Sequence, residues 1–394
     1  MNRPPAIAPF YPVMLLAGAV MISLGPLLGA ILHDAKLPRA LGGALSLSFF
    51  LGMNLAILAV NLVFGALSSR RTLLLGAAVL AAGLAALGGL AHGLPALCAA
   101  LAVAGFGYGV LNLFPGMFIS SLIKEGTQRA MTVVHFFFAA GVTATPVVLG
   151  RLLARGASWR AAVLGEAGLA AALFVFFLVA PVPDVEGRRN VRAAELGEIR
   201  RHNARLWAAL LAAVLLYVGL ENIYNVWLAL FQADTFGSGP FRAGMIVTLF
   251  WAGMTLGRLA AVPLAGRWPT RRGLLAACAA TAACIAVGSF APARLASEAG
   301  FVLAGVACAA IFPLVVGYAA GYPAWLSGVV YSTCIFASGI GAMAIPAAIG
   351  PAADRIGFRA AMALGVIPTA LLAVLAVVIQ RASEGARQPR SRAS

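Results

Sequence analysis

The sequence has 394 residues, of which 62% are hydrophobic and only 10% charged, and its mean hydropathy is +0.96. A water-soluble globule of this size needs more polar surface than such a chain can supply, so the composition excludes one and indicates an integral membrane protein. The formal net charge of +16 does not require a nucleic-acid partner, because membrane proteins use Lys and Arg to set their orientation.

Twelve long apolar runs predict twelve transmembrane helices, since roughly 20 apolar residues cross the bilayer core. A membrane β-barrel would instead show short segments of alternating hydrophobicity. The first run lacks a cleavage pattern and is expected to stay in the protein. The predicted helices cover about residues 10–33, 40–67, 72–91, 95–123, 131–153, 159–180, 206–232, 241–266, 273–291, 297–321, 325–350 and 359–380.

The sequence offers no sign of a cofactor. Its five cysteines fall inside predicted helices without metal-ligand spacing, so we expect small core residues rather than disulfides or a metal site. A nucleotide-binding loop of the P-loop type is also missing, which argues against ATP as a driving force. We therefore expect neither an enzyme nor a metalloprotein.

The chain divides into two halves of the same plan. We predict six-helix bundles at 1–180 and 206–380, a polar cytoplasmic linker at 181–205 and a basic tail at 381–394. An offset of about 200 residues superposes helix two on helix eight and helix five on helix eleven. Parallel repeats of this kind predict two bundles related by an axis along the membrane normal, with a substrate site between them. The matched positions are Gly65, Arg70 and Arg71 with Gly266, Arg271 and Arg272, and Gly141, Pro146, Gly150 and Arg155 with Gly341, Pro346, Gly350 and Arg355.

Basic residues set the predicted orientation. An even number of helices puts both termini on one side, which carries eighteen Lys and Arg residues against nine on the other. By the positive-inside rule both termini are expected in the cytoplasm, in a bacterial-type cytoplasmic (inner) membrane. The basic tail is expected to contact anionic lipid.

Several motifs resemble one known group of transporters. They are YVGLENIYNVWL in helix seven, FWAGMTLGRL in helix eight, QRAMTVVHFFFAAGVTATP entering helix five and IFP at 311–313. On these motifs the chain resembles the major facilitator superfamily and, within it, the fucose-permease-like sugar:proton symporters. The resemblance spans the whole chain and implies an all-α fold of two pseudo-symmetric six-helix bundles, alternating access, and a sugar moved with protons.

The chain also departs from the family pattern. The superfamily usually has G-x-x-x-D-R-x-G-R-R between helices two and three, but this loop reads GALSSRR, and GRWPTRR in the second half also lacks the acid. The fucose permease looks to carboxylates in helices one and four for proton coupling, and neither helix contains one here. Any proton coupling must therefore use another group.

Glu221 lies in the middle of helix seven, in the stretch LLYVGLENIYNVWLALF. An ionised side chain at the centre of a spanning helix costs roughly 2.5 to 3.5 kcal/mol, so an acid there is expected to have a function. Tyr217, Tyr224 and Asn225 share its stripe, which is expected to line a wet cavity. Glu221 is our first candidate for proton coupling; accepting sugar hydroxyls, or holding a helix kink in its protonated form, are the alternatives.

Helix eight presents Trp251, Thr255 and Arg258 on one face. Trp251 is expected to stack on a sugar ring, and Thr255 to line the site with it. We assign Arg258 to gating or structure, with binding of an anionic substrate as the alternative. The other residues assigned to gating or structure are Gly65, Arg70, Arg71, Gly266, Arg271 and Arg272.

Four further polar residues are candidates. Tyr108 and Asn112 in helix four and Asn54 in helix two suit sugar hydroxyls, although such groups also join membrane helices. His135, near the start of helix five, titrates near physiological pH and is the second candidate for proton coupling. A fixed hydrogen bond from His135 to the preceding loop is the alternative.

Together these features predict a secondary transporter for proton-coupled uptake of a small neutral polar solute such as a monosaccharide. A facilitative sugar uniporter and an exporter of amphipathic compounds are the alternatives on the same fold. A membrane receptor or enzyme would need a signalling domain or a catalytic cluster, and we find neither in the sequence. The expected partners are the substrate, the proton and membrane lipid, and the functional unit is expected to be a monomer.

Overall fold

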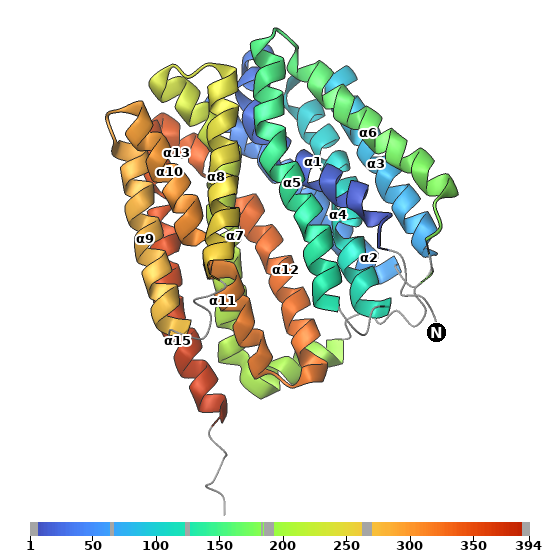
Figure 1. The fold of residues 1–394 in the computed structure, drawn as a ribbon, viewed down its shortest axis with the longest axis vertical. Coiled ribbons are helices and arrows are strands. Elements are labelled where there is room, and N and C mark those ends of the chain that lie inside the picture. The colour runs from blue at the N-terminus through green and yellow to red at the C-terminus, as the bar shows by residue number, and fades with distance from the viewer. Residues whose placement is uncertain are drawn as a thin grey trace, which may run out of the picture.

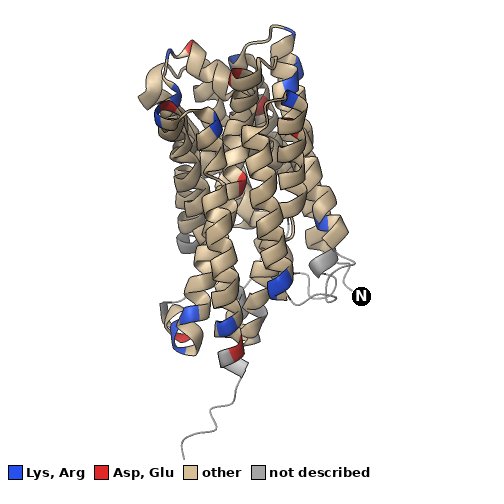
Figure 2. Cartoon of the chain, turned by 90° about the vertical axis from the view of Figure 1, so that its left-hand side faces the viewer, with Lys and Arg blue, Asp and Glu red and all other residues tan. Residues whose placement is uncertain are grey.

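The computed structural model describes residues 7–63, 67–122, 127–182, 184, 193–261 and 270–387, and the regular elements among them are helices (Figure 1). Twelve segments of these residues are long and apolar enough to cross a membrane, which agrees with the twelve predicted helices. Charged side chains gather toward the two ends of the bundle, and the band between them carries few (Figure 2). The protein is therefore an all-α membrane protein.

The first six spans pack together as one bundle. In it α1 packs against α5, α2 against α4, and α3 against both α4 and α6. The elements of this half are α1 (Phe10–Asp34), the 3₁₀ turn η1 (Arg39–Leu41), α2 (Gly42–Val63), α3 (Ser69–Gly89), α4 (Gly93–Leu122), α5 (Thr127–Ala154) and α6 (Trp159–Val179).

The last six spans pack as a second bundle. In it α7 packs against α12 and α15, and α10 packs against α8 and α9. Its elements are α7 (Ala193–Phe236), α8 (Pro240–Ala261), α9 (Thr270–Phe290), α10 (Arg294–Cys308), α11 (Ile311–Gly317), the 3₁₀ turn η3 (Tyr318–Gly321), α12 (Ala324–Ala347), α13 (Ile349–Ile356), α14 (Phe358–Ala363) and α15 (Val366–Arg387).

Three predicted helices of the second bundle are broken in the structure. Predicted helix ten is divided into α10 and α11, helix eleven into α12 and α13, and helix twelve into α14 and α15. The third residue of each following segment is a proline, namely Pro313, Pro351 and Pro368. Each helix breaks just before its proline, because a proline cannot donate to the carbonyl four residues earlier and its ring clashes with that carbonyl.

Helix α7 begins earlier than predicted, inside the polar linker. Within it Asn203 leaves helical geometry, with φ −161° and ψ 79°. Its Oδ1 accepts a hydrogen bond from the N–H of Leu206 at 2.9 Å, so Asn203 caps the membrane-spanning part of α7. Its Nδ2 donates to the carbonyl of Ala382 on α15 at 3.0 Å. The end of the linker is thus helical and attached to the last span.

Glycines at matched positions bring helices of both bundles into backbone contact. A Cβ on Gly141 of α5 would collide with the carbonyl oxygen of Leu15 on α1. In the second bundle a Cβ on Gly341 of α12 would collide with the carbonyl oxygen of Leu215 on α7. Both members of the second pair lie 200 residues beyond the first, so the predicted repeat is present in the packing.

The two bundles meet through α5 and α8, α2 and α12, and α1 and α7. A group of polar contacts between the bundles lies where α7 ends and α2 begins. This is the end of the molecule opposite the C-terminal end of α15 (Figure 1). Arg39 Nη2 lies 2.5 Å from Asp234 Oδ2, and the N–H of Ala40 donates to Asp354 Oδ2 at 3.2 Å. The Arg39 guanidinium also lies 4.8 Å from the ring centre of Phe358. We call Arg39, Asp234 and Asp354 the latch.

The replacement Gly52→Ala is expected to destabilise the protein, because a methyl group added to α2 would collide with the carbonyl oxygen of Ala102 on α4. Overpacking costs about 1–3 kcal/mol, which outweighs the roughly 1 kcal/mol that Ala gains in helix propensity. Gly168→Ala on α6 is the matched control, since nothing lies within 4 Å of its added methyl group. Thermal unfolding in detergent should give a lower Tm for Gly52→Ala and an unchanged or higher one for the control. Equal Tm values would contradict the close approach of α2 and α4.

Candidate functional site

A cavity of about 270 Å³ lies between the two bundles. Its walls come from α1, α2, α4 and α5 of the first bundle and from α7, α8, α11 and α12 of the second. Glu221 on its wall lies about 22 Å from the end of α7, at roughly 1.5 Å per residue, which is near the middle of the span. The polar residues of the lining are Tyr108, Asn112, His135, Tyr217, Glu221, Asn222, Trp251, Arg258 and Ser338.

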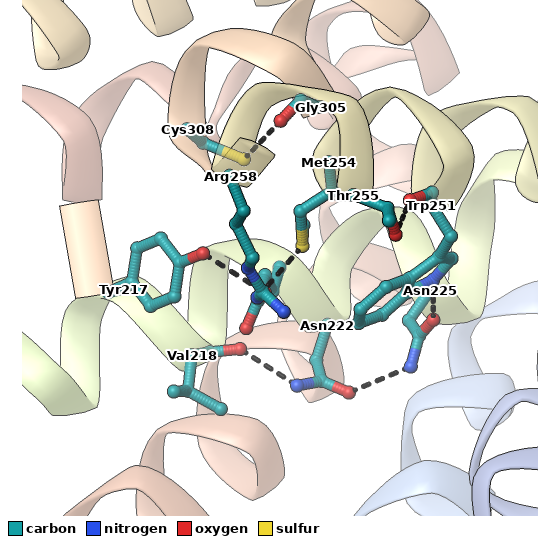
Figure 3. A network of polar contacts seen from close by, with 11 residues as sticks. Tyr217, Val218, Asn222, Asn225, Trp251, Met254, Thr255, Arg258, Gly305 and Cys308 are labelled. Carbon is teal, nitrogen blue, oxygen red and sulfur yellow. Dashed lines mark hydrogen bonds and ion pairs between the residues drawn. The ribbon is translucent and has the colours of Figure 1, made fainter. Parts of the chain in front are cut away.

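Glu221 and Arg258 form an ion pair in the cavity wall. Arg258 Nη2 lies 3.5 Å from Glu221 Oε1, and the Tyr217 hydroxyl donates to the same oxygen at 3.1 Å (Figure 3). Arg258 Nη2 also lies 3.2 Å from the sulfur of Met254. The Glu221 side chain is 10% exposed and that of Arg258 47%. The carboxylate is therefore enclosed beside a cation, as a buried charge requires, while much of the arginine remains accessible.

A second set of hydrogen bonds shapes the wall beside this pair (Figure 3). Asn222 Nδ2 donates to the carbonyl of Val218 at 2.8 Å, and Asn225 Nδ2 donates to Asn222 Oδ1 at 3.2 Å. Trp251 Nε1 in turn donates to Asn225 Oδ1 at 2.8 Å. Because these groups satisfy one another, they hold the indole in one orientation at the cavity wall. Asn225 itself is buried behind the lining.

Most of the side chains predicted to form the site reach this cavity. They come from α4, α5, α7 and α8, so the fold brings together residues that are far apart in the sequence. Arg258, which the sequence analysis assigned to gating or structure, is among them. The predicted residues that line the cavity are Tyr108, Asn112, His135, Tyr217, Glu221, Trp251 and Arg258.

Besides Asn225, three further residues predicted to bind substrate lie outside the lining. Tyr224 is buried inside the second bundle, against the rings of two phenylalanines. Asn54 lies against Gly339 of α12, and its Nδ2 donates to a carbonyl of its own helix at 2.9 Å. Thr255 likewise donates to a carbonyl of its own helix, at 3.0 Å. These contacts join helices or stay within one helix, and none of the three side chains is part of the cavity lining.

Asn222 and Ser338 line the cavity but were not predicted. A signal for Asn222 exists, because residues 218, 221, 222 and 225 follow the i, i+3, i+4, i+7 spacing of one helix face. The predicted stripe was centred on Glu221, and Asn222 lies outside it because consecutive residues of a helix are about 100° apart. Ser338 lies in a run of small and apolar residues that carries no comparable signal.

Two residues assigned to gating in the first half, Arg70 and Arg71, lie at the start of α3. Gly65, like Gly266 in the second half, falls outside the described residues. Arg70 Nη2 donates to the carbonyl of Ala180 at 2.9 Å, and the N–H of Arg71 donates to Ser68 Oγ at 3.3 Å. The loop before α3 lacks the usual acid, but Asp184 Oδ1 accepts from the N–H of Ser69 at 2.7 Å. A carboxylate from beyond α6 thus meets the positive end of α3.

Arg271 and Arg272 lie at the start of α9, away from the central cavity. They line a separate polar pocket of about 480 Å³ together with residues of η3 and α15. In its wall the Tyr318 hydroxyl donates to Gln380 Oε1 at 2.7 Å. These arginines therefore lie where the ends of three elements meet.

Comparison with known proteins matches both the sequence and the fold. The family model of the Major Facilitator Superfamily matches residues 10–292. No relative was found among curated protein sequences. A bacterial homolog to the human lysosomal transporter Spinster is similar with a TM-score of 0.80 and 14% identity, covering 98% of each chain.

Two sugar transporters of known structure are also similar. A D-xylose-proton symporter has a TM-score of 0.75 and 12% identity over 93% of this chain and 96% of its own. The E. coli fucose:proton symporter FucP has a TM-score of 0.63 and 17% identity over 97% of this chain and 98% of its own. At such identities these structures establish the fold alone. Since the family model covers well over half of the sequence, the chain belongs to the Major Facilitator Superfamily.

Proposed function

We propose that this protein is a secondary transporter that takes up a monosaccharide together with a proton, by exposing the central cavity to each side of the membrane in turn. The observation that carries this proposal is the cavity between the bundles, with a carboxylate in its wall among groups suited to a sugar. Its volume of about 270 Å³ lies just below the usual range of ligand pockets, roughly 300–1,000 Å³. A small solute therefore fits it better than the amphipathic compounds of an exporter.

The cavity wall offers complementary groups to a sugar. Trp251 is part of the lining, and its indole is oriented by the hydrogen bond to Asn225; apolar faces of sugar rings stack on aromatic rings. Asn112 and Asn222 carry amides that both donate and accept, and Tyr108 adds a hydroxyl. These groups match the alternating apolar and hydroxyl surfaces of a monosaccharide.

The proposed proton carrier is Glu221, with His135 as the second candidate. Both line the cavity, so both can exchange protons with water that enters it. Protonation of Glu221 would remove its attraction to Arg258 and change the wall that a solute contacts. A facilitative uniporter would need no such link between protonation and transport.

The latch supports alternating access. It joins the bundles at one end of the cavity, while the proposed mechanism needs each end to close in turn. We take residues 1–180 and 206–380 as the moving bodies and 181–205 as their connection. With both termini in the cytoplasm, as the basic residues predict, the latch lies on the outer side and the protein is closed to the outside.

Glu221→Gln is expected to abolish accumulation driven by an inward proton gradient, because an amide cannot carry the proton. Exchange of labelled sugar against internal sugar should persist, since it needs no net proton movement. Both are measured in proteoliposomes with a panel of labelled monosaccharides. Glu298→Gln is the matched control, because Glu298 pairs with Arg242 at 2.7 Å outside the cavity lining. Accumulation that survives Glu221→Gln, or a parent protein that exchanges sugar without responding to the gradient, would contradict the proposed role.

Arg39→Gln is expected to open the outer side of the cavity more often, because it removes the ion pair with Asp234 and the contact with Phe358. Losing these contacts is expected to destabilise the form closed on the outer side by about 1 kcal/mol, which shifts the ratio of open to closed protein roughly fivefold. The measurement is labelling of Ser338→Cys by a membrane-impermeant maleimide on whole cells, in a background without native cysteines. Arg355→Gln, on the exposed face of α13, serves as the control. Equal labelling rates for Ser338→Cys alone, with Arg39→Gln and with Arg355→Gln would rule out the latch as the outer gate.

A further inference from the structure

Arg258 lines the cavity, and its contacts there use few of the hydrogen-bond donors of its guanidinium. A guanidinium carries five N–H donors in a planar fork that matches a carboxylate through two parallel hydrogen bonds. Arg258 meets Glu221 through Nη2 alone, at 3.5 Å, and the side chain remains 47% exposed. Figure 3 shows its long side chain reaching from α8 toward Tyr217 and Asn222 in the cavity wall.

A second arginine on the same helix shows what a complete pair looks like. Arg242 contacts Glu298 with both arms of its fork, Nε to Oε1 at 2.7 Å and Nη2 to Oε2 at 2.7 Å. The pair in the cavity is longer and uses one nitrogen. Glu221 is therefore a partial partner for Arg258, and a second carboxylate can approach the guanidinium from the cavity.

The net charge of the cavity makes the binding of such a carboxylate depend on the protonation of Glu221. Among the described residues of the lining, Glu221 is the only carboxylate. The other titratable groups near the pair are neutral or able to become positive near pH 7, so none of them can replace the negative charge of Glu221. They are Tyr217 on α7, His135 on α5, Tyr108 on α4 and Cys308 on α10. When Glu221 takes up a proton, Arg258 is left as an uncompensated cation.

We propose that the substrate is a sugar acid whose carboxylate binds Arg258, and that it enters with one proton on Glu221 in an electroneutral step. This inference rests on the proposed function and changes one part of it, since the sequence favoured a neutral solute. In the empty cavity Glu221 and Arg258 neutralise each other. In the loaded cavity the proton neutralises Glu221 and the substrate carboxylate neutralises Arg258. Proton alone or anion alone leaves a net charge in the middle of the membrane, which disfavours closure of the cavity around it.

The rest of the lining accommodates the remainder of such a substrate. Trp251 lies about two turns before Arg258 on α8, so an aromatic ring and the guanidinium line the cavity from the same helix. Asn112 and Asn222 face the cavity from the other bundle and from α7, and supply partners for hydroxyl groups. A sugar acid combines these three features in one small molecule.

The test uses matched pairs of labelled solutes that differ by a carboxylate, D-glucose with D-glucuronate and D-galactose with D-galacturonate. Uptake into proteoliposomes is driven either by an inward proton gradient or by a negative-inside potassium diffusion potential set with valinomycin. A sugar acid moved with one proton carries no net charge, so the pH gradient should drive its accumulation and the potential should have no effect. A neutral sugar moved with a proton carries one positive charge, so the potential would stimulate it.

Variants at position 258 test whether Arg258 binds the carboxylate of the sugar acid. Arg258→Gln should raise the concentration of sugar acid for half-maximal uptake at least tenfold, whereas Arg242→Gln, the matched control on the same helix, should leave it unchanged. Arg258→Lys keeps the charge without the fork and should give an intermediate value. Each variant is used only if it is monodisperse in detergent, and the lysine variant provides the comparison if the glutamine variant fails to fold.

The outcomes separate this inference from the proposed function. Accumulation of a neutral sugar that is stimulated by the potential, without uptake of its acid, would overturn the sugar-acid assignment and leave proton-coupled sugar uptake standing. Sugar-acid uptake that responds to the potential, or is unchanged in Arg258→Gln, would overturn the electroneutral link. Failure of every sugar and sugar acid to accumulate under either gradient would overturn both.

Discussion

A charge in the middle of a membrane is stable only beside a group that compensates it. In this protein Glu221 and Arg258 compensate each other across α7 and α8, and Tyr217 adds a hydrogen bond to the carboxylate. Because the pair lies in the wall of the cavity, a change in the charge of either group changes the binding of whatever occupies it. In the proposed mechanism, proton binding and solute binding are linked through this one contact.

The scaffold keeps this contact in place by bringing helix backbones close together. Matched glycines fix α5 on α1 and α12 on α7, the helices that line much of the cavity. The break between α10 and α11 also contributes, because it places Phe312 in the lining, with its ring centre 5.8 Å from that of Tyr217. The network of Asn222, Asn225 and Trp251 then fixes the remaining wall. The proposed coupling requires a rigid wall, because in it solute and proton meet the same pair in a defined geometry.

Much of this arrangement could be predicted from the sequence. Long apolar runs indicate the spans directly, since only helices of about 20 apolar residues cross a bilayer as single segments. Glu221, Trp251 and Arg258 stand out because polar side chains are rare in such runs. The three helix breaks carried a signal in their prolines, but hydropathy alone does not register it.

The direction that each helix face takes was harder to predict. Tyr224 lies close to Glu221 on a helical wheel, but two phenylalanine rings from α8 and α10 enclose it inside the second bundle. Asn54 meets a glycine of the other bundle rather than the cavity. Periodicity defines which residues share a face, whereas the neighbouring helices decide whether that face meets solvent or core.

The most direct test of the link between proton and solute is the number of protons taken up when the purified protein binds its solute. A weakly buffered detergent solution and a pH electrode measure this number without any membrane or gradient. For a sugar acid that the parent protein binds, we expect close to one proton taken up at a pH where Glu221 is ionised, and close to none in Glu221→Gln. Binding by the parent without proton uptake, or equal uptake in both proteins, would contradict the account.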